Sequence, residues 1–514
     1  MSVKFKKLTA VFPAVIMVFV IFAAIPFSAS AAKGDSESAL SAYQHGDFRY
    51  VVSSEDDTAS ITGYDGNESD LTIPTDLDGH TVTKIGISSF QNCINIENIT
   101  IPDTVTRIAE YSFAGCTSLS NIIIPDSVAS IGRGAFSNCT GLTKITLPEG
   151  LTEINSYVFD DCTGLSDIII PENVEVIGAS AFIGCTGLTE ITIPDSVTYI
   201  GNHAFLNCTS LLNITIPDRG ISVYSTAFDN TACYESQPDG VVYVGNIAYK
   251  YKGEMPDNTY VVLKEGTQGL SVDMFNSCKN LAGVTIPDSV FEISDSAFYG
   301  CTGLKNVTIP DSVTLIGNSA FENCKELESV EISNSAVSIG RYAFRNCAQL
   351  KDVLIPDSVT EIKEEAFSGC TSITSITIPD SLTKIDYSVF EGCTSLKSIV
   401  IPKSVTEIEV SAFWYCPDDM VIYGYQGTEA ERFSKDEGYS FVSIGEIPIL
   451  ILGDVNGDGK IEIDDVTDVQ RYIAGTIDFI NSQKTRADVN KDGKVNVDDV
   501  TNLQKYIAGM SEFE

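Results

Sequence analysis

The stretch that decides the fold is ITIPDSVTYIGNHAFLNCTSL, residues 191–211, because closely similar units recur at intervals of 23 residues. Phenylalanine keeps this interval in two series, first at 90, 113, 136, 159, 182, 205 and 228, then at 275, 298, 321, 344, 367, 390 and 413. Proline keeps the same interval in most of these units. A period sustained in this way predicts a solenoid, whose units are stable only when they stack on one another.

Each unit is expected to form one coil of that solenoid. Ile191, Thr192 and Ile193 alternate apolar and polar side chains, which predicts a short, half-buried strand. Pro194 then ends the strand, because proline has no amide hydrogen to donate. The remaining apolar positions are expected to point inward and to meet their equivalents in neighbouring coils: Val197, Ile200, Ala204, Phe205, Cys208 and Leu211. The predicted fold class is therefore a mainly β solenoid of 23-residue coils.

The 14 cysteines follow the same period. Thirteen of them stand three residues after a periodic phenylalanine, from Cys93 to Cys416, and Cys233 alone is out of phase. One cysteine at one inward position of each coil predicts a ladder of thiols about 4.8 Å apart. Disulfides between consecutive rungs would strain the geometry of each bridge. We therefore expect free, buried, structural thiols, although secretion alone would favour disulfides.

The repeated unit resembles the BspA-like leucine-rich repeat, which reads I-x-I-P-x-S-V-x-x-I-G-x-x-A-F-x-x-C-x-x-L. The resemblance covers residues 71–416 and recurs in more than a dozen units. It implies a curved solenoid of the kind found on secreted or surface proteins that bind other proteins, often in adhesion.

Both ends of the array need a cap, since an open coil end is an unpaired edge. Residues 33–70 are expected to form the N-terminal cap, with a strand pair between Phe48 and Gly63. Residues 417–445 are expected to form the C-terminal cap from a strand at 421–423, a helix at 428–437 begun by Thr428, and a closing strand at 439–444. Trp414 is interpreted as part of the core of that cap, with a ligand platform as the alternative.

The array is interrupted once, between Phe228 and Phe275, by an insert at about residues 229–252. Two β-like runs around Gly245 and Asn246 predict a hairpin. Its tyrosines either pack the hairpin against the solenoid or form a protruding contact site. Residues 259–270 read as a degenerate repeat.

The C-terminal residues contain two related loops, DVNGDGKIEIDD at 454–465 and DVNKDGKVNVDD at 488–499. Oxygen-bearing side chains at loop positions 1, 3 and 5, a glycine at position 6 and an aspartate at position 12 are typical of an EF-hand calcium loop. Each loop runs into a predicted helix with its apolar residues on one face: Val466, Val469, Tyr472 and Ile473, then Val500, Leu503, Tyr506 and Ile507. No entering helix is predicted before the first loop, so calcium should stabilise the fold rather than switch it.

This segment is similar to a type I dockerin, the small all-α calcium-binding module that attaches secreted proteins to cohesins of a cellulosome scaffold. The resemblance implies two structural Ca²⁺ ions held by Asp454, Asn456, Asp458, Lys460, Asp465, Asp488, Asn490, Asp492, Lys494 and Asp499. It implies cohesin binding by Ile463, Asp464, Gln470, Arg471, Val497, Asp498, Gln504 and Lys505. Loop positions 10 and 11 read Ile-Asp and Val-Asp, where many dockerins have Ser-Thr. The two halves are alike, so either is expected to present the same docking face. The expected domain boundaries are a linker at 446–452 and the dockerin at 453–514.

The N-terminus predicts secretion. Lys4, Lys6 and Lys7 precede an apolar run, and small residues follow it at 28–32, so residues 1–32 are interpreted as a signal peptide. A membrane anchor is the alternative, but no transmembrane segment is expected in the mature chain. The net charge of −38 argues against nucleic acid as a partner.

These features predict a secreted, non-catalytic adhesion or binding subunit, attached to a cellulosome or cell surface, whose solenoid binds a protein or a glycan. The rival class is a polysaccharide-degrading enzyme, which needs two carboxylates flanking a cleft. No catalytic residues are predicted, because the length between the caps is taken up by coils and the sequence has no H-E-x-x-H or G-x-S-x-G motif. A carbohydrate-binding module is the third class, for which a single Trp is weak support and 21 Tyr are better.

Overall fold

The computed structural model describes residues 42–218, 220–444, 452–456, 460–477, 479, 481–491 and 493–510. The predicted signal peptide, most of the predicted linker, and the predicted calcium ligands Asp458 and Asp492 lie outside the described residues. Within these ranges, none of the helices has the length and hydropathy that a membrane crossing requires.

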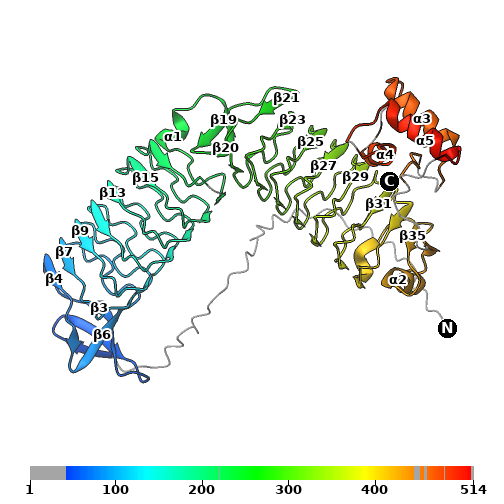
Figure 1. The fold of residues 1–514 in the computed structure, drawn as a ribbon. Helices are drawn as coiled ribbons and strands as arrows, with labels where there is room; N and C mark the ends of the chain where they lie inside the picture. Colours follow the sequence, from blue (N-terminus) through cyan, green and yellow to red (C-terminus); the bar gives the residue numbers. More distant parts are fainter. Residues whose placement is uncertain are drawn as a thin grey trace, which may run out of the picture.

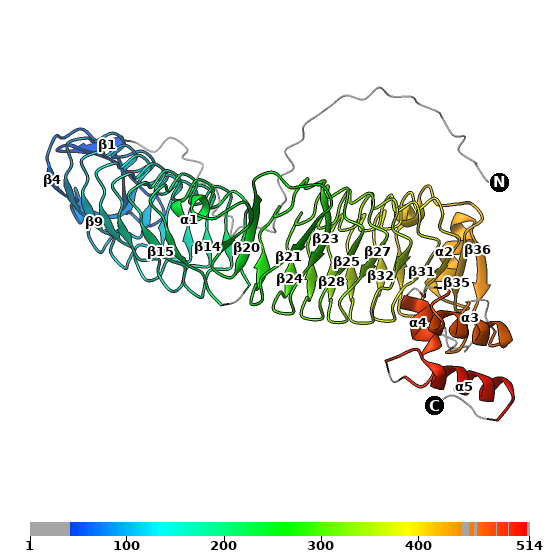
Figure 2. The same ribbon diagram turned by 90° about the horizontal axis from the view of Figure 1, so that it is seen from above.

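The predicted solenoid is confirmed, and its coils follow one another along an arc (Figure 1). Each coil contributes one strand to each of two series of parallel strands, named here series A and series B. Equivalent residues of neighbouring coils lie in register, as Ile99, Ile122 and Ile145 do in series A. Figure 2 shows the strands of successive coils standing side by side.

Series A contains the strands that the I-x-I pattern predicts. Before the insert they are β4 (Asp70–Thr72), β7 (Asn98–Thr100), β9 (Asn121–Ile123), β11 (Lys144–Thr146), β13 (Asp167–Ile168), β15 (Glu190–Thr192) and β17 (Asn213–Thr215). After it they are β21 (Thr259–Val262), β23 (Leu281–Thr285), β25 (Asn306–Thr308), β27 (Ser329–Glu331), β29 (Asp352–Val353), β31 (Ser375–Thr377) and β33 (Ser398–Val400). The degenerate repeat therefore forms a regular coil that begins at β21.

Series B lies on another side of each coil, after the proline turn. Its strands before the insert are β6 (His80–Ile85), β8 (Arg107–Ile108), β10 (Ser130–Ile131), β12 (Glu153–Ile154), β14 (Val176–Ile177), β16 (Tyr199–Ile200) and β18 (Ser222–Val223). Those after it are β22 (Gly269–Leu270), β24 (Glu292–Ile293), β26 (Leu315–Ile316), β28 (Ser338–Ile339), β30 (Glu361–Ile362), β32 (Lys384–Ile385) and β34 (Glu407–Ile408).

The periodic phenylalanines form two stacks along the solenoid axis. Within each stack the centroids of adjacent rings are between 5.0 Å, for Phe182 and Phe205, and 5.9 Å, for Phe136 and Phe159. The rings are fully or almost fully buried. Offset-stacked aromatic pairs add to the free energy that burial itself provides, so each coil is stabilised mainly by its two neighbours.

The ladder cysteines are free, and those inside each array are buried. Each such thiol donates a hydrogen bond to the carbonyl oxygen of the phenylalanine one coil back, as Cys116 does to Phe90 at 3.1 Å from Sγ to O. Cys93 and Cys278, in the first coils of the two arrays, are only half-buried. Burial raises the pKa of buried ladder thiols such as Cys139, Cys347 and Cys370, and that of Cys370 to about 12.

The thiols of the inner coils should therefore resist alkylation. A thiol reacts as its thiolate, and both burial and a raised pKa keep the thiolate scarce even at pH 9. We expect iodoacetamide to modify Cys93, Cys233 and Cys278 of the native chain at least ten times faster than Cys370, measured by mass spectrometry. Unfolding in guanidinium chloride should equalise the rates. Equal rates in the native chain would contradict this packing.

The insert is a hairpin that packs into the solenoid. Its strands β19 (Gly240–Val244) and β20 (Ile247–Lys252) are antiparallel, and β20 pairs in parallel with β22. A short helix, α1 (Ala232–Glu235), precedes it. Tyr249 is fully buried, and its ring meets Phe228 edge-on at 5.8 Å. The tyrosines thus take the packing role, and the hydrophobic core changes here from one cluster to a second.

Further strands and a helix flank the coils at both ends. At the N-terminus, β1 (Ala42–His45), β2 (Phe48–Val52) and β3 (Ala59–Tyr64) form antiparallel pairs, and a short strand, β5 (Asp76–Leu77), pairs with β6. At the C-terminus, β35 (Val421–Gly424), α2 (Glu429–Glu437) and β36 (Ser440–Ser443) follow a 3₁₀ turn, η1 (Val410–Phe413). Thr428 is the N-cap residue of α2, but its hydroxyl donates to the Tyr425 carbonyl instead of capping the helix.

The interpretation of Trp414 as cap core is wrong. Its side chain is 52% exposed. Phe433 of α2 and Tyr439 fill the end of the core instead, both packed edge-on against Phe413. Because Trp414 directly follows an inward phenylalanine, its side chain points outward.

The C-terminal segment is helical, as predicted. It contains α3 (Ile463–Ile473), α4 (Asn481–Ala487) and α5 (Val497–Ile507). Val466 and Val469 of α3 pack with Val500 and Leu503 of α5 in a separate small core. Ile473, Tyr506 and Ile507, predicted for the same apolar faces, are exposed at the C-terminal ends of these helices.

Candidate functional site

The first loop is organised around the carboxylate of Asp465, which is the third residue of α3 and is fully buried. Its Oδ1 accepts hydrogen bonds from the backbone N–H of Val455 at 2.8 Å and of Asn456 at 3.1 Å. Its Oδ2 accepts one from the N–H of Glu462 at 2.9 Å, which closes a capping box at the start of α3. A single carboxylate thus ties the first residues of the loop to the helix that follows.

The second loop repeats this arrangement around Asp499, which is also fully buried. Asp499 accepts from the N–H of Asn490 at 3.3 Å and from that of Asn496 at 2.9 Å. Asp488, at loop position 1, accepts from the N–H of Gly493 at 2.8 Å, across the tight turn. Burial raises the pKa of Asp499, while the hydrogen bonds from the backbone N–H groups of Asn496 and Asn490 lower it.

This donor set fits a calcium ion. Asp454, Asp465 and Asp499 are all buried carboxylates. Burying a carboxylate without a compensating positive charge is costly, and backbone N–H groups offset only part of the cost. Calcium prefers carboxylate and carbonyl oxygens, which these loops offer. No group of three or more His, Cys, Asp or Glu side chains gathers within the described ranges, and these ranges leave out Asp458 and Asp492.

The residues predicted to contact a cohesin form matched pairs on α3 and α5. Ile463 and Val497 stand at the first position of their helices and are 62% and 64% exposed. The other predicted contact residues are exposed as well: Asp464, Gln470, Arg471, Asp498, Gln504 and Lys505. α3 and α5 pack through their apolar residues, which leaves both sets of polar residues open to a partner.

α4 is a helix that the sequence analysis missed. It ends at Ala487, immediately before Asp488, so the second loop has a helix on both sides. The Arg486 carbonyl accepts from the N–H of Gly453 at 2.8 Å, and the Arg486 guanidinium donates to the Asp454 carbonyl at 3.3 Å. α4 therefore links the start of the first loop to the start of the second.

Comparison with protein families agrees with this architecture. Residues 83–193, 175–305 and 292–419 each match a family model described as BspA type leucine rich repeat region (6 copies), and together they cover more than half of the chain. The chain belongs to the BspA-type leucine-rich repeat family. Residues 452–508 of this BspA-type protein match the dockerin type I domain, a calcium-binding module. Both are modules of non-catalytic types.

Solved structures similar to this BspA-type protein include bacterial leucine-rich repeat proteins. A leucine rich cell surface protein from Faecalibacterium prausnitzii is 29% identical over 70% of this chain and 94% of its own, with a TM-score of 0.30. A leucine-rich repeat protein from Bacteroides ovatus is 27% identical over 78% of this chain and 100% of its own, with a TM-score of 0.32. No curated protein matches the chain.

The BspA-type solenoid presents outward the residue between the two apolar positions of the I-x-I pattern, at or just after the end of the series A strands. This row is uncharged except at Glu331 and contains Thr100, Ile123, Thr146, Ile169, Thr192, Thr215, Thr285, Thr308, Glu331, Leu354, Thr377 and Val400. All of them are exposed except Val400, which is half-buried. Threonine and aliphatic residues are also favoured by strands as such, so the row is a surface with no assigned ligand.

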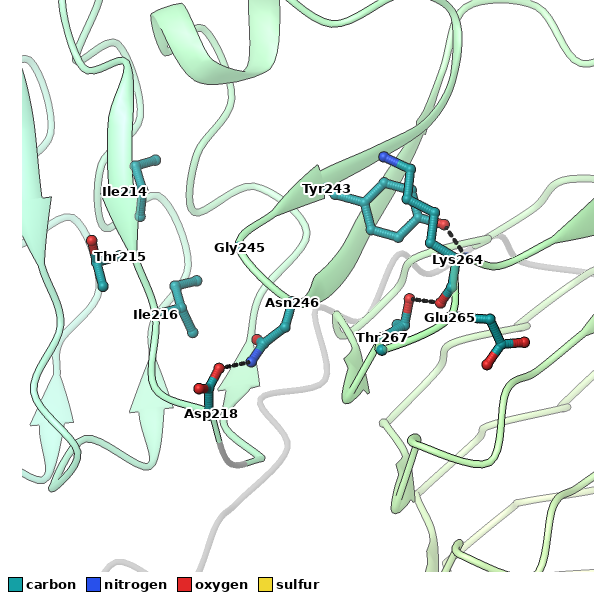
Figure 3. Close-up of a pocket in the computed structure, with 11 residues that line it drawn as sticks. Ile214, Thr215, Ile216, Asp218, Tyr243, Gly245, Asn246, Lys264, Glu265 and Thr267 are labelled. Atoms are coloured by element: carbon teal, nitrogen blue, oxygen red, sulfur yellow. Dashed lines mark hydrogen bonds between the residues drawn. The ribbon is translucent and has the colours of Figure 1, made fainter.

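The solenoid has one notable pocket in its described part, of about 490 Å³, beside the insert hairpin (Figure 3). Several of its polar groups contact one another. The Asn246 amide donates to Pro217 and Asp218, and the backbone N–H of Lys264 donates to the Tyr243 hydroxyl at 3.0 Å. The Lys264 ammonium lies 4.1 Å from the centre of the Tyr243 ring and covers it. We therefore interpret the pocket as a packing gap at the interruption of the array.

Proposed function

We propose that this protein is a secreted, non-catalytic interaction subunit. Its dockerin would attach it to a cohesin on a cellulosome scaffold, and its solenoid would bind a protein or a glycan at the cell or scaffold surface. The single observation that supports this proposal best is the pair of buried position-12 carboxylates, Asp465 and Asp499, each beside an exposed helix start. Extracellular location agrees with both matched modules, and residues 1–32 are proposed as the signal peptide.

The proposed calcium ligands are Asp454, Asn456, Asp458, the Lys460 carbonyl and Asp465 in the first loop, and Asp488, Asn490, Asp492, the Lys494 carbonyl and Asp499 in the second. When bound, calcium supplies the positive charge that the buried carboxylates need. The chain's own residues hold each loop against its helix, as Asp465 and Asp499 do by accepting backbone N–H groups. The role of the site is therefore to order a docking surface.

The proposed docking surface consists of equivalent residues on α3 and α5. Ile463 and Val497 offer exposed apolar contact, and Asp464 and Asp498 offer charge beside it. Gln470 and Arg471 on α3 correspond to Gln504 and Lys505 on α5. Because the two faces are so alike, a cohesin would bind either of them.

An enzyme is the weaker alternative. The rows of coils from β4 to β34 leave no separate catalytic domain between the caps within the described residues. The pocket beside the hairpin pairs Asp218 with the Asn246 amide and the Lys264 N–H with the Tyr243 hydroxyl, as packing contacts of the hairpin. A polysaccharide-degrading role would therefore belong to other subunits on the same scaffold.

The test is capture of the full chain by immobilised cohesins, with calcium and with EGTA. We expect capture by at least one cohesin in calcium and its loss in EGTA. The double variant Ile463→Ala/Asp464→Ala should weaken capture less than about threefold, because the α5 face remains. The quadruple variant that adds Val497→Ala/Asp498→Ala should weaken it at least a hundredfold.

Two results would count against the proposal. Capture that persists in EGTA would remove the role of calcium. Loss of capture in the first double variant would show that only the α3 face binds.

A further inference from the structure

Trp414 and Tyr415 form an exposed aromatic pair at the end of the solenoid. Trp414 is 52% exposed and Tyr415 is 77% exposed, and the two follow the last inward phenylalanine, Phe413. Exposed apolar surface formed by large residues that are neighbours in the chain is a mark of binding surfaces. Trp414 is also the only tryptophan of the chain.

The backbone at Tyr415 makes this pair more notable. Every coil has a residue with positive φ two positions after its phenylalanine, and Tyr415 has φ of 60°. In the other coils this position holds a glycine or a small polar residue: Asn92, Gly115, Asn138, Asp161, Gly184, Asn207, Asn230, Ser277, Gly300, Asn323, Asn346, Gly369 and Gly392.

Tyrosine is therefore held here in a conformation that glycine and asparagine adopt with less strain, at a cost of about 1 kcal/mol. Because its side chain is exposed, packing in the core does not repay that cost. The fold requires the left-handed backbone at this position but not a tyrosine, so the choice of this residue is a pointer to function.

The pair is too small for a stable protein partner. Specific protein interfaces bury about 800 Å² on each side, whereas two aromatic side chains bury about 250 Å² each at most. An anionic polymer is also disfavoured, since the chain carries a net charge of −38 and the exposed carboxylates of Asp418 and Asp419 follow the pair. A neutral sugar chain is compatible with both the small contact area and the negative charge of the protein. Its pyranose rings carry no charge and stack their C–H faces on aromatic rings.

We propose that Trp414 and Tyr415 form a binding platform for a neutral polysaccharide. This inference rests on the proposed function, of which it specifies the solenoid's ligand, and it assigns that ligand to the last coil instead of to the series A row. Tyr415 supplies the more exposed ring, and Trp414 extends the apolar face along the sugar chain.

The experiment uses the emission of Trp414 in the full chain, with cellohexaose, xylohexaose and mannohexaose as probes and calcium present throughout. We expect a saturable change in emission with at least one of the three. Tyr415→Asn, which places the residue of other coils at this position, should weaken that binding at least tenfold and leave the melting temperature equal or higher. The matched control Tyr260→Ala removes a tyrosine that is 74% exposed on β21 and should leave binding within twofold.

Several outcomes would overturn the platform. They are no emission change with any of the three sugars, unchanged binding in Tyr415→Asn, or binding that falls steeply with added salt, which would indicate a charged ligand. An emission change caused by EGTA alone would indicate that the chain's own dockerin covers the pair. Capture by cohesin is measured on the same preparations, so its failure is distinguished from failure of the sugar platform.

Discussion

Removal of calcium with EGTA should unfold α3 and α5 while the coils of the solenoid stay folded. The C-terminal module has a core of only a few residues, such as Val466, Val469 and Leu503, and it buries three aspartates beside that core. Without a bound cation, the cost of burying these carboxylates exceeds what so small a core offsets. Hydrogen exchange followed by mass spectrometry should show loss of protection in residues 463–473 and 497–507, and unchanged protection in residues 71–416.

Two variants distinguish the loss of a calcium ligand from the loss of negative charge near the site, as each affects calcium affinity. Asp465→Asn should weaken calcium binding by the first loop at least tenfold, because it removes a charge at a buried ligand position. Asp464→Asn removes the same charge from the neighbouring exposed residue and should change the affinity less than twofold. Magnesium should not replace calcium, since it keeps its water ligands and needs a tighter geometry. Persistent protection of α3 and α5 in EGTA would contradict a structural role for calcium.

The repeats could be predicted from the sequence because the local pattern of each one shows which of its side chains face the core. In the unit at 191–211, the alternation of apolar and polar residues around Thr192 predicts the strand, and Pro194 marks where it ends. Phe205 and Cys208 identify the side of the coil that faces the core. Neighbouring coils then repeat the same contacts, so a prediction for one coil holds for all. The same logic located α3 and α5, since each begins within the last three residues of a loop motif.

Other features depend on contacts that no local pattern encodes. Most coils have a second left-handed residue two positions before the phenylalanine, such as Tyr111 and Tyr342. Their backbone N–H groups donate to the next coil, to Arg133 and Glu364 respectively, so the stack imposes the conformation on residues that do not favour it. The exposure of Trp414 likewise depends on Phe433 and Tyr439, which reach the end of the core from a later part of the chain.

In the candidate site too, some features follow from the local sequence and others depend on contacts between distant parts of the chain. The loop motifs identify oxygen ligands by spacing alone, but α4 has a polar sequence without a clear apolar face, so it gave no helical signal. Ile473 and Ile507 follow the apolar period of their helices, yet the shared core of α3 and α5 is too short to cover them. In so small a module, an apolar side chain on α3 or α5 is buried only where the other helix extends far enough to cover it.

The insert hairpin divides the solenoid into two packing units. The phenylalanine stack stops at Phe228, whose N–H donates to the Tyr249 hydroxyl at 2.9 Å instead of to a carbonyl of the next coil. A second stack begins at Phe275. The buried clusters change at the same place, the first reaching Tyr249 and the second starting from Ala248. Since repeat proteins are stabilised by nearest neighbours, this weaker junction should let the two units unfold separately.

Phe321→Ala should therefore lower the stability of the second unit by about 3–5 kcal/mol and leave the first unit almost unchanged. Phe321 stacks between Phe298 and Phe344 at 5.0 and 5.2 Å, so its loss breaks two ring contacts and leaves a cavity. Phe136→Ala is the matched variant in the first unit. It should lower the stability of the first unit and leave the second almost unchanged. Hydrogen exchange in calcium measures each unit separately, and Phe321→Leu should lose less than half as much as Phe321→Ala. If either alanine variant lowers protection equally in both units, the hairpin transmits stability across the junction and the solenoid is one cooperative unit.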